Sequence, residues 1–176
     1  MSRFICGLLL VFCIACQSST QQGPAAPTKI GEDQAISQLA DQLIANPTTQ
    51  AHKDQNLIVN YAIDKGLGVQ RTASGMYYQM LEEGEGEHPA KGGKVTVHYE
   101  GRLLDGKVFD SSYRNGSPLT FSLGQVIRGW QEAIPMLRPG GKAMFLIPSE
   151  LAYGPMGYPG MIPPNSVLRF DVELIK

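Results

Sequence analysis

The residues best suited to chemistry in this chain are large aromatic side chains in its second half. They stand in separate segments, at Tyr99, Phe109, Trp130, Tyr153, Tyr158 and Phe170. Aromatic side chains gathered from several elements build a concave apolar pocket, which suits a small ligand or a peptide. The same stretch has no dense cluster of His, Cys or paired carboxylates. We therefore expect a function performed by shape and low polarity, with no metal site and no cofactor.

Composition narrows the class of protein that could carry such a pocket. Of the 176 residues, 43% are hydrophobic and 18% are charged, which is typical of a globular protein. The length allows one medium-sized domain with an appendage. The formal net charge is −1 and Lys and Arg do not cluster, so we expect no binding to nucleic acid.

The N-terminus reads as an export signal. Arg3 supplies a positive charge, and residues 4–15 form an apolar run of about 12 residues, which is short for a membrane span. The run CIAC at 13–16, followed by polar residues, resembles a bacterial lipoprotein signal. That resemblance implies that Cys16 is lipidated and becomes the mature N-terminus. The alternative is an ordinary signal peptide cleaved near Ala15, which leaves Cys16 as a free thiol.

The sequence predicts four successive parts. Residues 1–16 form the lipoprotein signal peptide, 17–31 a flexible tether, 32–69 a helical extension and 70–176 the main domain. All three cysteines lie within the first part, so no disulfide can brace the domain that follows. Acyl chains on Cys16 would anchor the protein to a membrane, because each buried methylene contributes about 0.8 kcal/mol.

The extension carries two helical patterns. Ile36, Leu39 and Leu43 recur at the spacing of an amphipathic helix. We expect the Asn-Pro pair at 46–47 to end this helix and to cap a second one, which stops at Gly66. Two short helices with narrow apolar faces must cover those faces. They can do so on the main domain, on a second copy of the chain in a homodimer through residues 32–66, or on a partner.

Beyond residue 70 the pattern favours strands. Strand-like runs occupy residues 74–81, 95–100, 143–147 and 168–174. One helical pattern, at 130–137, interrupts them, and Pro135 limits its length. This order predicts an α+β domain in which an antiparallel sheet curls around one short helix, preceded by the small helical segment.

One strand in this domain is apolar on both faces. If Ala143, Phe145 and Ile147 face the short helix, Met144 and Leu146 must face away from it, because side chains alternate along a strand. We expect the N-terminal helices to cover these two residues. The alternative is a scattered apolar surface.

Several motifs in the domain resemble those of FKBP-type peptidyl-prolyl isomerases. They are VHYEG (97–101), DGKVFDSS (105–112), VIRGW (126–130), AYGPMGYPGMIPPN (152–165) and FDVEL (170–174), in the family's order and close to its spacing. The resemblance covers residues 70–176 and implies a sheet of five to six antiparallel strands around the Trp130 helix. The arrangement as a whole resembles exported bacterial members with an N-terminal helical extension. It implies a lipoprotein in the cell envelope, attached to the outer membrane on its periplasmic side.

The resemblance also assigns roles to residues. It implies that Trp130 forms the floor of the pocket and that Tyr153 and the Ile127 backbone N–H donate hydrogen bonds to a bound carbonyl. Tyr99 is placed to hydrogen-bond Asp110 at the pocket edge, and these residues with Trp130 and Tyr153 form the catalytic set. The implied substrate-binding residues are Phe109, Leu119, Val126, Ile127, Tyr158, Ile162 and Phe170.

The residue chemistry suits rotation about an X-Pro bond in a client polypeptide. That rotation crosses a barrier of about 18–20 kcal/mol because it destroys amide resonance, and it needs no proton transfer. A dry apolar cavity penalises the planar amide more than the less polar twisted one. Two other interpretations stay open. The pocket could grip prolyl segments without catalysis, as a chaperone or adaptor, or the helical segment could be the important part of a structural envelope lipoprotein.

Overall fold

The structure is a computed structural model that describes residues 32–90 and 92–176. The predicted signal peptide (1–16), the tether (17–31) and with them Cys16 lie outside the described residues. Within the described part of the chain, no helix combines the length and the apolar character needed to cross a membrane.

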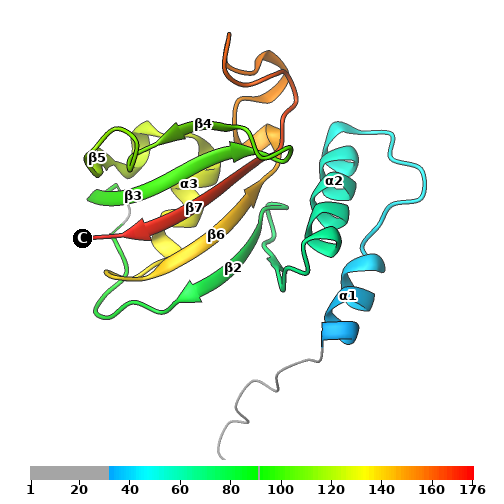
Figure 1. Cartoon of the computed structure of the whole chain (residues 1–176), viewed down its shortest axis with the longest axis horizontal. Coiled ribbons are helices and arrows are strands. Elements are labelled where there is room, and N and C mark those ends of the chain that lie inside the picture. The colour runs from blue at the N-terminus through cyan, green and yellow to red at the C-terminus, as the bar shows by residue number, and fades with distance from the viewer. Residues whose placement is uncertain (1–31, 91) are drawn as a thin grey trace, which may run out of the picture.

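The helices and strands follow the predicted order (Figure 1). They are α1 (Glu32–Ala40), α2 (Gln50–Asp64), β1 (Gln70–Arg71), β2 (Tyr77–Glu82), β3 (Lys94–Leu103), β4 (Val108–Ser111), β5 (Leu119–Ser122), α3 (Arg128–Ala133), β6 (Lys142–Ile147) and β7 (Leu168–Leu174). Short 3-10 turns η1 (Leu123–Gln125), η2 (Ile134–Met136), η3 (Ser149–Leu151) and η4 (Gly154–Met156) join them. Pro135 lies in η2, where the α-helical part of the 130–137 pattern has already ended.

The strands form one antiparallel sheet in the order β1-β2-β6-β7-β3-β4, with β5 paired to β3. Figure 1 shows α3 behind the curved sheet and the two N-terminal helices beside it. The predicted α+β architecture is confirmed. The sheet has seven strands rather than five to six. The two-residue β1 accounts for the difference, because Gln70 and Arg71 pair with Tyr78 and Tyr77 immediately after the extension.

Strand β6 divides the interior into two apolar clusters. Ala143, Phe145 and Ile147 belong to the main core around α3. Met144 and Leu146, which are 1% and 0% exposed, belong to a second core with residues of both N-terminal helices. The predicted covering of these two side chains by the extension is therefore confirmed. Each such burial contributes about 1.5–3 kcal/mol, which fixes the extension on the domain.

The second helix begins later than the sequence predicts. Its N-cap is Thr49, whose hydroxyl accepts from His52 N at 3.2 Å, so Asn46 does not cap it. The reason is Asn56, which bonds to both the N–H and the C=O of Ile44 at 2.8 Å. These bonds hold the segment after α1 against α2 and delay the helix start. The predicted stop at Gly66 is confirmed by its φ of 62°, which glycine adopts without a Cβ penalty.

Candidate active site

A cavity of about 330 Å³ opens between the sheet and α3. Its lining comes from six parts of the chain: Tyr99 on β3, Phe109 and Asp110 on β4, Leu119 on β5, Gln125, Val126, Ile127 and Trp130 around the start of α3, Tyr153 between η3 and η4, and Phe170 on β7. Most of the sequence-predicted site residues therefore meet in one place, with Tyr158 and Ile162 outside it. Gln125 is the lining residue that no role was predicted for, although it directly precedes the VIRGW motif.

Trp130 closes the floor of this cavity through edge-on contacts with two strands. Its ring lies 5.0 Å from that of Tyr99 and 5.2 Å from that of Phe170, with interplanar angles of 84° and 77°. Phe109 meets Phe170 in the same manner at 5.6 Å. Edge-to-face aromatic pairs of this kind contribute about 0.5–1.5 kcal/mol beyond their buried area. The walls are thus fixed before any ligand arrives.

Two glycines allow these rings and α3 to come so close. A Cβ on Gly129 would lie 2.5 Å from Ile147 Cγ2, so only glycine lets α3 rest on β6 at this point. A Cβ on Gly101 would lie 2.7 Å from ring carbons of both Phe109 and Phe170. Gly101 is paired with Phe170 across β3 and β7, which places it directly beneath the two rings.

We expect Gly101→Ala to disturb the cavity while the sheet remains intact. The added methyl must displace Phe109 or Phe170, and overpacking of this kind costs about 1–3 kcal/mol. Binding of a prolyl peptide should weaken about tenfold, since that corresponds to about 1.4 kcal/mol. Fluorescence titration measures it, and far-ultraviolet circular dichroism checks the fold. Gly124→Ala is the matched control, because a Cβ there meets nothing within 4 Å.

The polar edge of the cavity is organised around Asp110. The Tyr99 hydroxyl donates to Asp110 Oδ2 at 2.5 Å, and Ser111 N donates to Oδ1 at 2.8 Å. Asn115 Nδ2 adds a longer bond to Oδ1 at 3.4 Å. The carboxylate is therefore held from both sides, and its contacts orient the Tyr99 ring against Trp130.

Both tyrosines at the cavity keep their protons at high pH. Burial, followed by the hydrogen bond to Asp110, raises the pKa of Tyr99 well above its usual range. Burial, followed by the negative charge of Asp110, also raises the pKa of Tyr153. A raised pKa means that the neutral, donating form persists to a higher pH than in a free tyrosine, which ionises near about pH 10.

This predicts that ligand binding does not fall through loss of a tyrosine proton below about pH 10. The dissociation constant of a neutral prolyl peptide should change less than about twofold between pH 7 and 9.5, as measured by isothermal titration calorimetry. A tenfold weakening with a midpoint near pH 9 that disappears in Tyr153→Phe would contradict it.

The residues of the long loop at 152–165 lie in two different places: Tyr153 lines the aromatic cavity, whereas Tyr158 and Ile162 do not. Tyr158 and Ile162 pair through two backbone bonds of 2.8 Å, and they line a separate hollow of about 270 Å³. Ile162 is buried in the core, whereas Tyr158 is half exposed. The Tyr158 ring still reaches Tyr153 edge-on at 5.7 Å. The loop is thus folded on itself, and it contacts the cavity only through Tyr153.

Residues 85–175 match the family described as FKBP-type peptidyl-prolyl cis-trans isomerase, which is more than half of the chain. The chain belongs to this family. The FKBP-type chain is 50% identical over 108 residues to the peptidyl-prolyl cis-trans isomerase Mip of Coxiella burnetii, a match that covers 61% of this chain and 47% of Mip. It spans between 40% and 47% of the length of the curated relatives it matches first.

Solved structures extend the likeness beyond the FKBP domain. The crystal structure of FkpA from Escherichia coli matches with a TM-score of 0.65 at 41% identity, over 82% of this chain and 63% of that one. A peptidyl-prolyl cis-trans isomerase from Pseudomonas syringae matches with a TM-score of 0.59 at 34% identity, over 88% and 98% respectively. Both structures cover a larger part of this chain than the family match to residues 85–175. The structural likeness therefore includes part of the preceding helical extension.

Proposed function

We propose that this FKBP-type chain catalyses cis–trans isomerisation of X-Pro bonds in exported polypeptides and so assists their folding in the cell envelope. The observation that carries the proposal is the preformed aromatic cavity on Trp130, bordered by the hydroxyl of Tyr153 and the Tyr99–Asp110 pair. A prolyl ring is flat and apolar on its faces, which suits the edge-on walls of this cavity.

The cavity can lower the barrier without any covalent step. The planar amide is more polar than the twisted one, so transfer into an apolar cavity destabilises the ground state more than the transition state. Four decades of acceleration require about 5.5 kcal/mol. Removal from water, together with one or two hydrogen bonds of about 1–1.5 kcal/mol each, can supply an energy of this size. We assign the donors to the Tyr153 hydroxyl and to the Ile127 N–H at the start of α3.

A protease-coupled assay on an X-Pro tetrapeptide tests the proposal. Wild type should accelerate isomerisation far above the uncatalysed rate, and Tyr153→Phe should lower kcat/KM about tenfold because one donor is lost. Tyr113→Phe is the matched control, since Tyr113 is 57% exposed and its hydroxyl lies 3.4 Å from Glu173, outside the cavity. Peptide binding without any acceleration would instead support the non-catalytic chaperone or adaptor.

We also propose that the protein is held in the envelope by a lipid on Cys16, at the periplasmic face of the outer membrane. The support is the lipoprotein-like run at 13–16 that follows the apolar segment. Mass spectrometry of the mature N-terminus tests it. A peptide that begins at an acylated Cys16 is expected, and an unmodified Cys16 would refute it.

We further propose that residues 32–66 mediate a homodimer. The support is a set of apolar side chains that the second core leaves exposed, with Ile36 at 38%, Leu43 at 40% and Leu57 at 50%. Sedimentation equilibrium should show a dimer that Leu57→Glu dissociates. A wild-type monomer at high micromolar concentration would contradict the proposal.

A further inference from the structure

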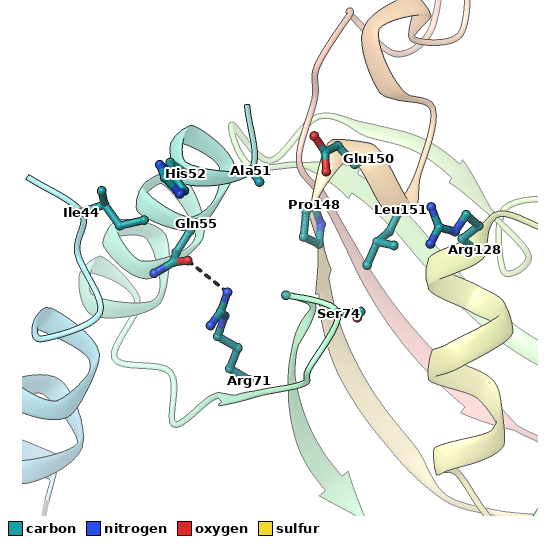
Figure 2. A pocket seen from close by; sticks show the side chains of 11 residues that line it. Ile44, Ala51, His52, Gln55, Arg71, Ser74, Arg128, Pro148, Glu150 and Leu151 are labelled. Carbon is teal, nitrogen blue, oxygen red and sulfur yellow. Dashed lines mark hydrogen bonds between the residues drawn. The ribbon is translucent and has the colours of Figure 1, made fainter. Parts of the chain in front are cut away.

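A larger hollow lies between α2 and the main domain. This interdomain cleft has a volume of about 410 Å³ (Figure 2). Figure 2 shows Gln55 and Arg71 on one side of it, Arg128 on the other, and Pro148 and Glu150 between them. It shares no lining residue with the aromatic cavity.

The cleft is a built feature, because a buried carboxylate fastens its two walls together. Asp54 on α2 is fully buried, and its Oδ2 accepts from Ser149 N at 2.8 Å and from Ser149 Oγ at 2.6 Å. Its Oδ1 accepts from Gln50 at 2.6 Å. Ser149 opens η3, so these bonds set the distance between α2 and the 148–151 wall. A ligand in this cleft meets walls that are already in place, which lowers the cost of binding.

The charges of the cleft favour an anionic occupant. Arg71 donates to the neutral Gln55 Oε1 at 3.1 Å, and its guanidinium lies 5.9 Å from the Tyr77 ring centre. Among the described residues, neither Arg71 nor Arg128 forms an ion pair, and Glu150 is the one carboxylate in the lining. Two arginines therefore keep their charges and several free donors for a carboxylate ligand.

The cleft and the aromatic cavity are next to each other along the chain. Arg128 directly follows Ile127, which lines the cavity. Glu150 and Leu151 in the cleft wall lie just before Tyr153. Consecutive Cα atoms are about 3.8 Å apart, so one wall begins where the other ends. For a polypeptide with its proline in the cavity, the cleft is therefore the neighbouring hollow across residues 127–128 and 151–153.

We propose that the interdomain cleft is a second client subsite, which binds an acidic segment of the same polypeptide near its X-Pro bond. This inference rests on the proposed isomerase function. Because α2 supplies one wall of the cleft, the helical extension would then contribute directly to the selection of client polypeptides.

Peptides of matched length test the subsite. One carries a single X-Pro bond with a Glu-Glu pair on its N-terminal side, another carries the pair on its C-terminal side, and each has a Gln-Gln counterpart. At low salt, one acidic placement should have a KM about fivefold below its neutral counterpart, as expected for two exposed ion pairs. The ratio should approach one at 1 M salt, because the Debye length then falls to about 3 Å.

Variants locate the effect. The double variant Arg71→Gln, Arg128→Gln should bring the ratio of acidic to neutral KM close to one. Lys53→Gln should retain the ratio, because Lys53 is exposed on α2 and does not line the cleft. Equal KM values for acidic and neutral peptides in wild type would overturn the proposal. An equal loss of preference in Lys53→Gln would also overturn it, because it would indicate a long-range field rather than a site.

The same peptides separate this inference from the proposed function. Turnover of the neutral peptide without any acidic preference would leave the isomerase standing and refute the subsite. If no peptide is turned over, the proposed isomerase function is refuted. Fluorescence anisotropy of labelled acidic and neutral peptides then decides the subsite, with the same fivefold ratio expected in their dissociation constants and equal constants refuting it.

Discussion

Replacing Asp54 with alanine is expected to lower the free energy of unfolding by about 3 kcal/mol, because it removes the acceptor of two donors on the buried Ser149. Each donor left unsatisfied in the interior costs about 1–3 kcal/mol. The loss should appear as a lower midpoint in urea denaturation with an unchanged slope. It should also appear as faster amide hydrogen exchange at 149–151, where the wall loses its anchor on α2.

Two further variants show whether the loss comes from these hydrogen bonds. Asp54→Asn keeps an oxygen that can accept from Ser149, so it should lose about 1 kcal/mol. Ser149→Ala removes the hydroxyl but leaves its N–H bond to Asp54 in place, and it should fall between the two. An Asp54→Ala protein within about 0.5 kcal/mol of wild type would show that the 148–151 wall does not depend on this contact.

Replacing Trp130 with alanine is expected to reduce kcat/KM at least about a hundredfold, which corresponds to about 2.7 kcal/mol. The indole is 4% exposed and touches Tyr99, Phe121 and Phe170. Its loss opens the floor of the cavity to water, and the apolar environment that disfavours the planar amide is lost. The same change should cost about 3–5 kcal/mol of stability, as large core truncations do.

Trp130→Phe separates catalysis from folding in this experiment. A phenyl ring still provides an apolar floor, so this variant should retain activity within about tenfold and lose less stability. The protease-coupled assay is therefore run on both variants at a temperature where circular dichroism shows them folded. A folded Trp130→Ala protein within threefold of wild type would place the catalytic energy elsewhere in the cavity.

The elements around the site could be predicted because their signals are local. Alternation along 168–174 and along 95–100 predicts which side chains face inward. Strand β7 follows it throughout, and β3 follows it except at Thr96, which is buried. The same rule, applied to a strand with two apolar faces, correctly required a cover for Met144 and Leu146. Patterns of this kind need only the periodicity of the chain and the cost of exposing apolar area.

The features that the sequence did not reveal depend on contacts between distant residues. Asp54 and Ser149 are separated by 95 positions, and neither belongs to a sequence motif that predicts contact with the other. Asn56 overrides a good capping signal at 46–47 through its two bonds to Ile44. The pairing of Tyr158 with Ile162 is a local contact instead, and it arises because one loop folds on itself without a regular pattern in the sequence. Their positions in the motif did not indicate that Tyr158 and Ile162 line a separate hollow and not the aromatic cavity.

The double-sided burial of β6 has a consequence for anyone who wishes to produce the FKBP-type domain alone. Removing residues 32–69 would uncover Tyr77, Met144, Leu146 and Val167, which together form the domain's half of the second core. A contiguous apolar patch of this kind promotes self-association. Polar substitutions at Met144 and Leu146, whose side chains face away from the aromatic cavity, are expected to keep a truncated domain soluble.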